Sequence, residues 1–517
     1  MAMLYKKRMR FVAGLLAIVS TLVLNACTDH RAIPDPNTVP DVTVYALNDA
    51  NQLLRFSVRT PSTTVPVSIS GTASDERILS IDFRPATGQL YGVSNQSRLF
   101  VINPMTGAAR PLTTTAFTPA VSGGIVALDF NPTVDRIRLV TNTGQDLRLN
   151  PETGGVAATD GMINGAAGAM ISAVAYTNNR AGATSTTLYD IDPATDRLYI
   201  QNPPNNGTLA DVGSLGLDIT GAAGFDISPT DNTQGLVAVT FNGASELQQI
   251  NLSTGRLQKL GNLPGTIIGL AIPTEPVAYA LDGASSLLIF NPMNPAPVTK
   301  TLMGLANGET LVGIDTRPLN GQLYALGSSS RLYTIAVTAT NSWSAVAVGS
   351  AGAFALSGAE FGFDFNPTVD RIRVVSNTGQ NLRLNPIDGT LTATDGPLAF
   401  SPASGMPNVT AAAYTNNFAG AMTTTLYDIE TRSGSAVLYA QNPPNNGTLM
   451  PVGPLGIEAE GANGFDIGGM SNTAYALLRS GGSTKVYMIN LTTGAATAGA
   501  TLTGSSTVRG FTLGLGF

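Results

Sequence analysis

The chain contains two consecutive copies of one unit, and this duplication constrains its fold more than any other feature. The eight residues from Asn131 to Arg138 recur unchanged from Asn366 onward, 235 residues later. A nine-residue run that starts at Gln201 recurs unchanged 240 residues later. Residues 42–272 and 277–515 are therefore two copies, and any fold for this sequence must be built twice.

A weaker period of about 45 residues runs inside each copy. Each period holds short apolar or alternating runs separated by Gly, Asn and Pro, such as residues 81–83, 88–93 and 98–103. Such runs are typical of strands and hairpins. Four strands in 40–50 residues are typical of a propeller blade. With five periods in each copy, the sequence predicts an all-β chain of two five-bladed β-propellers with four-stranded blades.

The ends of the copies favour two separate rings. The first copy opens with an apolar run at 42–47 and closes with another at 267–272, and the second does so at 277–281 and 508–513. A last strand that completes the first blade closes a ring and removes exposed strand edges. Each copy carries its own closing strand, so two tandem rings fit better than the alternative, one ten-bladed propeller.

Composition agrees with many short strands and excludes several classes of function. Gly supplies 56 of 517 residues and Pro 31, and both are poor in helix interiors. The formal charge is −6, which argues against nucleic acid as a partner because its binding rests on Lys and Arg. The Gly-rich stretches lack the Lys of a phosphate loop, which argues against nucleotide binding. One His and one Cys exclude a His/Cys zinc site and a disulfide within the chain.

The N-terminus predicts secretion and lipid anchoring. Residues 1–10 carry four of the basic residues, and a 14-residue, mainly apolar run follows at 11–24, which is too short to span a membrane but fits a signal peptide. The run ends before Cys27, in a sequence that resembles the lipobox of bacterial lipoproteins. We therefore expect a signal peptide at 1–26, then a lipidated Cys27 and a tether at 27–41 that includes the single His.

This N-terminus also predicts the location of the protein in the cell. The lipid would attach the chain to a membrane of the bacterial cell envelope. In lipoproteins of Gram-negative bacteria, Asp after the lipidated Cys resembles an inner-membrane retention signal. Thr28 stands there instead. We therefore expect the outer membrane, on its periplasmic face or at the cell surface.

Several long motifs, repeated in both copies, carry a family resemblance. They include the runs that begin at Asn131 and Gln201, the run from Ala175 to Asn179, and Gly224 to Ile227. With these motifs the chain resembles the bacterial domain of unknown function 4394 (DUF4394) over nearly its whole mature length. The resemblance implies secretion and a propeller-like fold. It implies no established reaction.

Acidic residues on the expected innermost strands are the candidate metal ligands. If these strands line a central channel, three carboxylates converge in each ring, and Ca²⁺ takes six to eight such oxygen ligands. The alternative is that each carboxylate bonds backbone amides or an Arg within its blade. The candidate residues are Asp82, Asp129 and Asp226 in the first copy and Asp315, Asp364 and Asp466 in the second.

Uncharged amides and tyrosines are the candidate ligand-binding residues. Amides donate and accept hydrogen bonds in one plane, as recognition of a glycan requires. The alternative is that the Asn-rich runs only form turns. The candidates are Tyr176, Asn178, Asn179, Asn205 and Asn206 in the first copy, and Tyr414, Asn416, Asn417, Asn445 and Asn446 in the second.

Two further charged motifs have structural interpretations. Arg136 and Arg138 alternate on one strand, and buried arginines need carboxylate partners, so they predict ion pairs between blades. The acidic run from Asp190 to Asp196 lacks the Gly and distal Glu of a calcium loop. We interpret it as a solvated turn.

These observations favour a binding or scaffolding module that presents propeller loops to a glycan or an envelope protein. No catalytic residue is predicted, and an enzyme is the less favoured reading. The alternative function is a Ca²⁺-dependent hydrolase or lactonase that uses channel carboxylates. No cofactor other than this Ca²⁺ is expected.

Overall fold

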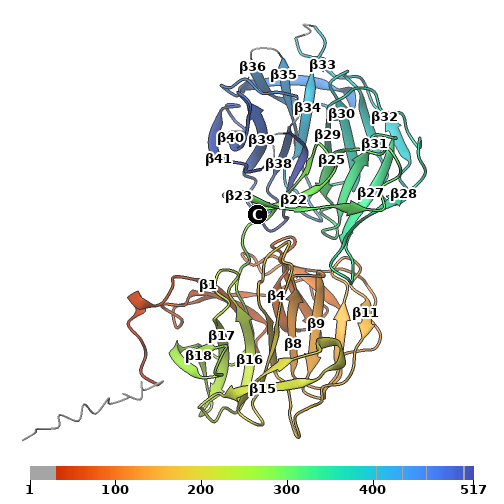
Figure 1. Cartoon of the computed structure of the whole chain (residues 1–517). Coiled ribbons are helices and arrows are strands. Elements are labelled where there is room, and N and C mark those ends of the chain that lie inside the picture. Colours follow the sequence, from red (N-terminus) through yellow and green to blue (C-terminus); the bar gives the residue numbers. More distant parts are fainter. Residues whose placement is uncertain (1–30, 403–404, 433–434, 462, 505–506) are drawn as a thin grey trace, which may run out of the picture.

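The chain folds into two bodies of β-sheet (Figure 1). The computed structural model describes residues 31–517 apart from 403–404, 433–434, 462 and 505–506. Within this part there are 42 strands and three short 3₁₀ turns, η1 (Pro36–Thr38), η2 (Pro204–Asn206) and η3 (Pro444–Asn446), and no α-helix. The described part also holds no helix with the length and apolarity needed to cross a membrane.

The first 20 strands form five four-stranded sheets. Their bounds are β1 (Thr43–Asn48), β2 (Gln52–Ser57), β3 (Val65–Ser68), β4 (Ile78–Phe83), β5 (Leu90–Ser94), β6 (Leu99–Ile102), β7 (Ala109–Pro111), β8 (Val126–Asn131), β9 (Arg136–Thr141), β10 (Asp146–Leu149), β11 (Val156–Thr159), β12 (Ala173–Tyr176), β13 (Leu188–Asp192), β14 (Arg197–Gln201), β15 (Leu209–Ser214), β16 (Gly221–Ile227), β17 (Gln234–Phe241), β18 (Ala244–Asn251), β19 (Leu257–Asn262) and β20 (Ile267–Ala271). The sheet orders are β20-β1-β2-β3, β4-β5-β6-β7, β8-β9-β10-β11, β12-β13-β14-β15 and β16-β17-β18-β19, all antiparallel.

The remaining 22 strands repeat this plan. Their bounds are β21 (Ala278–Asp282), β22 (Leu287–Asn291), β23 (Asn294–Lys300), β24 (Leu302–Met303), β25 (Leu311–Thr316), β26 (Leu323–Gly327), β27 (Arg331–Val337), β28 (Trp343–Val348), β29 (Phe361–Asn366), β30 (Arg371–Ser376), β31 (Asn381–Leu384), β32 (Leu391–Thr394), β33 (Ala399–Phe400), β34 (Val409–Tyr414), β35 (Leu426–Arg432), β36 (Ser435–Gln441), β37 (Thr448–Pro454), β38 (Gly464–Ile467), β39 (Ala474–Ser480), β40 (Ser483–Ile489), β41 (Ala496–Thr501) and β42 (Val508–Leu513). The sheet orders are β42-β21-β22-β23, β25-β26-β27-β28-β24, β29-β30-β31-β32, β34-β35-β36-β37-β33 and β38-β39-β40-β41. The two-residue strands β24 and β33 add parallel pairs at two outer edges.

The first strands of the sheets contact one another in two closed circuits. In the first copy the circuit runs β20, β4, β8, β12, β16 and back to β20, and in the second it runs β42, β25, β29, β34, β38 and back to β42. Among the described residues, no sheet contains strands from both copies. The all-β prediction and the four-stranded antiparallel unit are therefore confirmed.

The predicted closing strands pair as expected. In the first copy β20 pairs with β1, with Leu270 opposite Ala46. In the second, β42 pairs with β21, with Phe511 opposite Ala280. Each copy therefore completes its first sheet with its own last strand.

Glycine permits the close approach of the inner strands. A Cβ at Gly224 in β16 would lie 2.3 Å from the backbone nitrogen of Leu270 in β20. A Cβ at Gly464 in β38 would lie 2.5 Å from the backbone nitrogen of Phe511 in β42. No side chain fits at either place, so the repeated Gly-Phe-Asp-Ile motif begins with the only residue that the circuit accommodates there.

The described part of the expected tether is docked on the first copy, which differs from a free linker. Arg31 forms an ion pair with Glu246 at 2.6 Å and lies over the ring of Phe241. Gln258 donates to the carbonyl oxygen of Ala32 at 2.6 Å. These partners lie in β17, β18 and β19, so the chain is fixed from Arg31 onward. The predicted signal peptide, Cys27 and His30 lie outside the described residues.

The two copies touch through backbone and side-chain contacts. The Tyr279 hydroxyl donates to the carbonyl oxygen of Ala86 at 2.8 Å, and Gly516 N donates to the carbonyl oxygen of Thr87 at 2.8 Å. Arg110 adds a bond to the carbonyl oxygen of Leu319 at 2.8 Å. The C-terminal end thus lies between the bodies (Figure 1).

Candidate functional site

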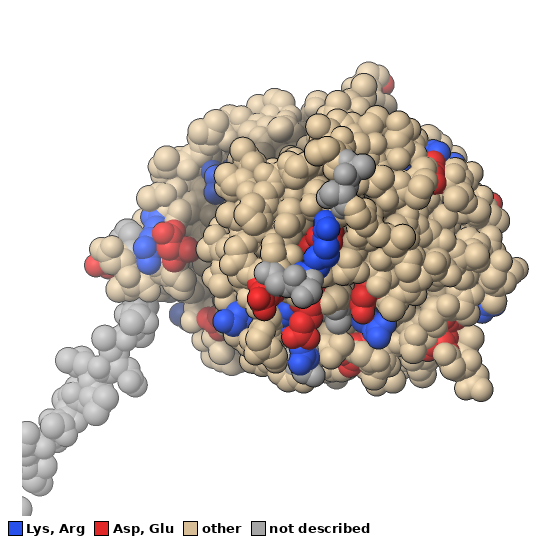
Figure 2. Space-filling model, turned by 90° about the horizontal axis from the view of Figure 1, so that it is seen from above, with Lys and Arg blue, Asp and Glu red and all other residues tan. Residues whose placement is uncertain are grey.

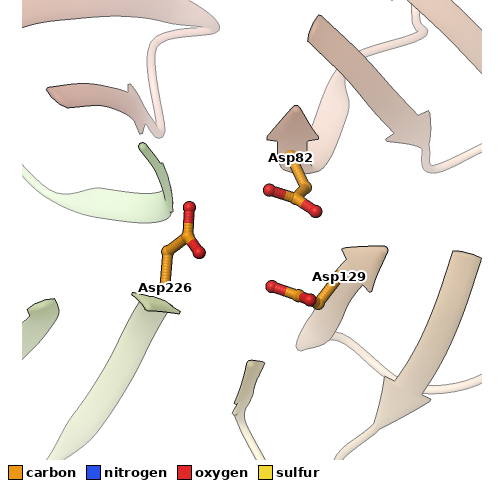
Figure 3. Close-up of side chains that lie close together, drawn as sticks. All are labelled: Asp82, Asp129 and Asp226. Carbon is orange, nitrogen blue, oxygen red and sulfur yellow. The ribbon is translucent and has the colours of Figure 1, made fainter. Parts of the chain in front are cut away.

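Three carboxylates converge at the centre of each copy, as the sequence predicts. In the first copy Asp82, Asp129 and Asp226 come from the inner strands β4, β8 and β16 (Figure 3). One oxygen of each lies within 4.8 Å of the others. We call this set the first triad, and its equivalent, Asp315, Asp364 and Asp466, the second triad.

Backbone amides hold the carboxylates in place. The oxygens of Asp82 accept from the amides of Phe83 at 2.7 Å and Phe130 at 2.8 Å. Asp226 accepts from the amide of Ile272 at 2.6 Å, just beyond β20. Each of these aspartates thereby links its own strand to the next one in the circuit. The predicted alternative, bonding to backbone amides, therefore describes part of their role.

The first triad retains acceptors that have no donor. Asp129 Oδ1 accepts from the amide of Tyr176 at 3.1 Å, but its buried Oδ2 has no hydrogen-bond partner in the described structure. Beside it, Asn179 donates from Nδ2 to Asp226 Oδ1 at 3.4 Å, and its own buried Oδ1 also has no partner. Uncompensated buried acceptors are costly, so this centre favours a proton or a cation.

Burial perturbs the acidity of the first triad. It raises the pKa of Asp226 to about 7, against the lowering effect of its amide donors. Burial, reinforced by the neighbouring carboxylates, raises the pKa values of Asp82 and Asp129 well above the usual range. The negative charge of the site is therefore disfavoured unless something positive shares it.

The second triad differs by one hydroxyl group. Thr512 Oγ1 lies 2.9 Å from Asp315 Oδ1 and 3.0 Å from Asp466 Oδ2. Asp364 accepts from the amide of Tyr414 at 3.1 Å, as Asp129 does from Tyr176. The two triads are thus equivalent in backbone geometry, but only the second holds a side-chain hydroxyl between its carboxylates.

The predicted ligand-binding amides do not form one exposed surface. Tyr176, Asn179, Tyr414 and Asn417 are buried to 1% exposure or less. They are therefore not available to a glycan at the surface, and the prediction does not hold for these four. The tyrosine hydroxyls instead accept from the buried arginines at 3.2 Å, Tyr176 from Arg138 and Tyr414 from Arg373.

The other amides lie nearer the surface, where most of them close turns. Asn178 and Asn416 are half-buried, and their backbone amides donate to Asn232 and Asn472 at 2.7 Å. Four are exposed: Asn205, Asn206, Asn445 and Asn446. Of these, Asn205 and Asn445 accept from the buried arginines at 2.8 Å. Most of the predicted amide residues therefore have a structural role in turns and do not form a shared binding surface.

The arginines of the repeated hairpin form buried networks with partners other than those nearest in sequence. Arg138 pairs with Asp146 and Asp160, both at 2.6 Å. Asp135 instead pairs with Arg84 of the neighbouring sheet at 2.5 Å. Asp146 lies in β10 and Asp160 directly follows β11, so the ion pairs of Arg138 lie within its own sheet and the prediction of pairs between blades is wrong for this residue. The pair between sheets is formed by Arg84 instead.

The prediction of a solvated turn from Asp190 to Asp196 holds only for its second half, because residues 193–196 form a turn between β13 and β14. Asp190 and Asp192 are fully buried in β13, the second strand of its sheet. Within the described part of the chain, neither carboxylate oxygen of Asp190 has a hydrogen-bond partner, and the same holds for Asp428 in the second copy. Burial raises the pKa of Asp190 well above its usual range and that of Asp428 to about 8.

A cavity of about 530 Å³ lies between the two copies, and no feature of the sequence predicts it. The first copy contributes Tyr45, Val101 and Met105, among others, and the second contributes Phe418, Met470, Leu515 and Phe517. Phe418 is 43% exposed and Met470 37% exposed. A few polar residues, such as Gln89 and Arg110, lie among these apolar side chains. The lining comes from segments far apart in sequence, so no local motif signals it.

Charged side chains are sparse on the face seen in Figure 2, where both signs occur together in small groups. This distribution agrees with a chain in which only 12% of residues are charged.

The profile of DUF4394, a domain of unknown function, matches residues 52–271 and 286–512. The chain belongs to the DUF4394 family. The two matched segments correspond to the two copies found in the sequence, which confirms the tandem arrangement of DUF4394 units. No curated protein is significantly similar to the chain.

Solved structures give only distant likenesses to this DUF4394 protein. One is the extracellular domain of a protein from B. thetaiotaomicron described as a one-component system, with 11% identity, a TM-score of 0.24, and coverage of 89% of this chain and 66% of that chain. Another is PorZ, a bacterial surface component of the type-IX secretion system of Porphyromonas gingivalis, with 13% identity, a TM-score of 0.25, and coverage of 89% and 65%. The DUF4394 chain thus spans just under two thirds of these proteins. At such TM-scores the likeness carries no argument.

Proposed function

We propose that this chain is a lipid-anchored binding module of the bacterial cell envelope, with its ligand site in the cavity between the two copies. The cavity is the observation that carries the proposal, because pockets at domain interfaces are frequent ligand sites. Its volume of about 530 Å³ lies within the range typical of small-molecule sites.

We further propose that each copy is a five-bladed β-propeller. The closed circuit of five inner strands supports this, as does the closing strand in each copy. The absence of any sheet shared between the copies, among the described residues, favours two rings over one ten-bladed ring.

The lining of the cavity suits an amphipathic ligand. Aromatic and thioether groups such as those of Phe418, Met470 and Met105 are partly exposed, so an apolar ligand can contact them without a rearrangement of the protein. Arg110 and Gln89 offer hydrogen-bonding groups beside them. An apolar chain or ring with one polar end fits this division better than a uniformly polar glycan does.

The alternative of a hydrolase that uses the central carboxylates has less support. All six triad residues are at most 1% exposed. Two cavities lined by inner-strand residues, one in each copy, measure about 10 Å³, room for about one water molecule, and none of the six carboxylates lines them. The carboxylates are thus shielded from the solvent through which a substrate would arrive.

Binding of cis-parinaric acid, a fluorescent fatty acid, tests the ligand site. We expect saturable binding by residues 28–517, and at least a tenfold loss in Met470→Asp, because the variant places a charge in the apolar lining. Met422→Asp is the matched control, since Met422 is 92% exposed and lies outside the lining. Equal affinities of the two variants would contradict the proposal. Binding of soluble peptidoglycan fragments that Met470→Asp leaves unchanged would favour the exposed amides instead.

Membrane fractionation tests the anchor. In a Gram-negative host we expect the full-length chain in the outer-membrane fraction, labelled by an alkyne analogue of palmitate. Cys27→Ser removes the acylated thiol, so label and membrane association should both be lost. An unlabelled wild-type chain would refute lipid anchoring without bearing on the cavity.

A further inference from the structure

We propose that the first triad binds one divalent cation, preferentially Ca²⁺, and that in the second triad a threonine hydroxyl occupies the corresponding place. The inference is independent of the cavity between the copies. It concerns Asp82, Asp129 and Asp226, which the sequence alone does not distinguish from their equivalents in the second copy.

Charge and geometry give the first argument. The three carboxylates are at most 1% exposed, and among the described residues none of the ion pairs involves them. Their ligand oxygens lie within 4.8 Å of one another. Ca²⁺ binds oxygen at about 2.3–2.6 Å, so one ion can contact three oxygens so spaced. Mg²⁺ demands shorter bonds and a more regular shell, and we expect it to bind more weakly.

Unsatisfied acceptors give the second argument. Buried Asp129 Oδ2 has no hydrogen-bond donor. The three carboxylates point toward one another (Figure 3), so this oxygen belongs to a group aimed into the centre. Asn179 Oδ1 is a further buried acceptor without a donor, and its amide lies against Asp226. Acceptors that gather without donors are what a hard cation recognises.

Comparison of the copies gives the third argument. Ile272 N and Leu513 N donate to Asp226 Oδ2 and Asp466 Oδ2, each at 2.6 Å. The preceding residues, Ala271 and Thr512, therefore occupy equivalent positions. In the second copy the Thr512 hydroxyl bridges two carboxylates, whereas Ala271 has no polar group. Only the first triad thus lacks an internal group between its carboxylates.

A cation at this position would join three of the five inner strands of the first copy, because the ligands come from β4, β8 and β16. The site is buried, with each carboxylate at most 1% exposed. We therefore assign the ion a structural role, in which it offsets carboxylate repulsion and closes the circuit more firmly.

Metal analysis of the purified residues 28–517, after exposure to CaCl₂ and removal of free ion, tests the proposal. We expect one Ca²⁺ per wild-type chain and none in Asp129→Asn. Asp364→Asn is the matched control, because it makes the same change in the second triad, and it should retain one Ca²⁺. Ala271→Thr should also lose the ion, although it keeps all three carboxylates.

Thermal unfolding provides a second readout that does not depend on tight retention of the ion. Millimolar CaCl₂ should raise the melting temperature of wild type and Asp364→Asn by several degrees relative to EDTA, since binding to the folded state stabilises it. Asp129→Asn should show no such rise. A wild-type chain with neither bound Ca²⁺ nor a rise would overturn the proposal, as would equal losses in Asp129→Asn and Asp364→Asn. Neither result would affect fatty-acid binding at the cavity.

Discussion

Asp428 illustrates what burial does to a carboxyl group that has no hydrogen-bond partner. Its side chain is fully buried, and burial raises its pKa to about 8 against the lowering effect of Arg373. In the unfolded chain the same group titrates near its ordinary value of 3.8. Between these two values the folded state holds a proton that the unfolded state has released.

This difference fixes the sign of a pH effect. Because the folded state binds the extra proton, Asp428 lowers stability as pH rises from about 4 to about 8, by up to about 1.4 kcal/mol per pH unit. Asp428→Asn cannot titrate, so its urea midpoint should fall less than that of wild type between pH 5 and 7.5. The exposed Asp388→Asn should retain the wild-type slope. A wild-type slope in Asp428→Asn would contradict the assignment.

The sequence predicts the triads but not Asp428 or its equivalent Asp190, and the reason is physical. The inner-strand aspartates recur at equivalent positions of the repeated unit. Because the inner strands of such units meet at the centre of a ring, the sequence predicts that these aspartates converge. The acidic run at Asp190 has the composition of a solvated turn, but part of it forms the second strand of a sheet. Neighbouring sheets cover both faces of that strand, and alternation alone does not reveal two-sided burial.

At the level of elements, the contact between β16 and β20 depends on a missing side chain. Gly224→Ala would place a Cβ 2.3 Å from the nitrogen of Leu270, so the two inner strands must separate. We expect a loss of about 1–3 kcal/mol in the free energy of unfolding, the usual cost of overpacking. Gly124→Ala is the control, since no atom lies within 4 Å of its Cβ position. Equal stability of the two variants in urea would disprove this account.

The closing strands were predictable because each is an apolar run displaced to the far end of its copy. The two-residue strands β24 and β33 were not, since two residues are too few to show a period. Their parallel pairing arises from loops that lie against an outer edge, at Trp343 and Thr448. Such pairs depend on tertiary contacts and not on local preference.

For the whole molecule, residues 514–517 join the two copies and line the cavity. Removing them eliminates the bond from Gly516 to Thr87 and the Phe517 ring. The single tryptophan, Trp343, lies in a small cleft with Arg84 and Tyr279, where the copies meet. We expect the truncated chain to show red-shifted tryptophan emission, because the cleft admits water, while far-UV circular dichroism stays unchanged. Unchanged emission would argue that other contacts suffice to hold the copies together.

The cavity could not be predicted, whereas the two copies could. Repetition is visible in a single sequence, but the way two repeated bodies meet depends on surfaces that do not repeat. Residues near Met105 line the cavity, but equivalent positions of the other copy are not required to line it, because the two copies contribute different surfaces. Sequence motifs lie within a single copy, so they do not reveal a site that forms only where the two copies meet.

The docking of the N-terminal segment on the first copy has a consequence for how the protein would be oriented at the membrane. Arg31 is fixed to Glu246, and only four peptide steps separate it from Cys27. An extended chain spans at most about 3.6 Å per residue, so the Cα atoms of Cys27 and Arg31 would lie within roughly 14 Å of each other. With the proposed anchor in place, the edge formed by β17, β18 and β19 would rest close to the lipid headgroups. The molecule would then adopt a restricted set of orientations relative to the bilayer. A long, flexible linker would instead allow it to move away from the membrane and to rotate freely.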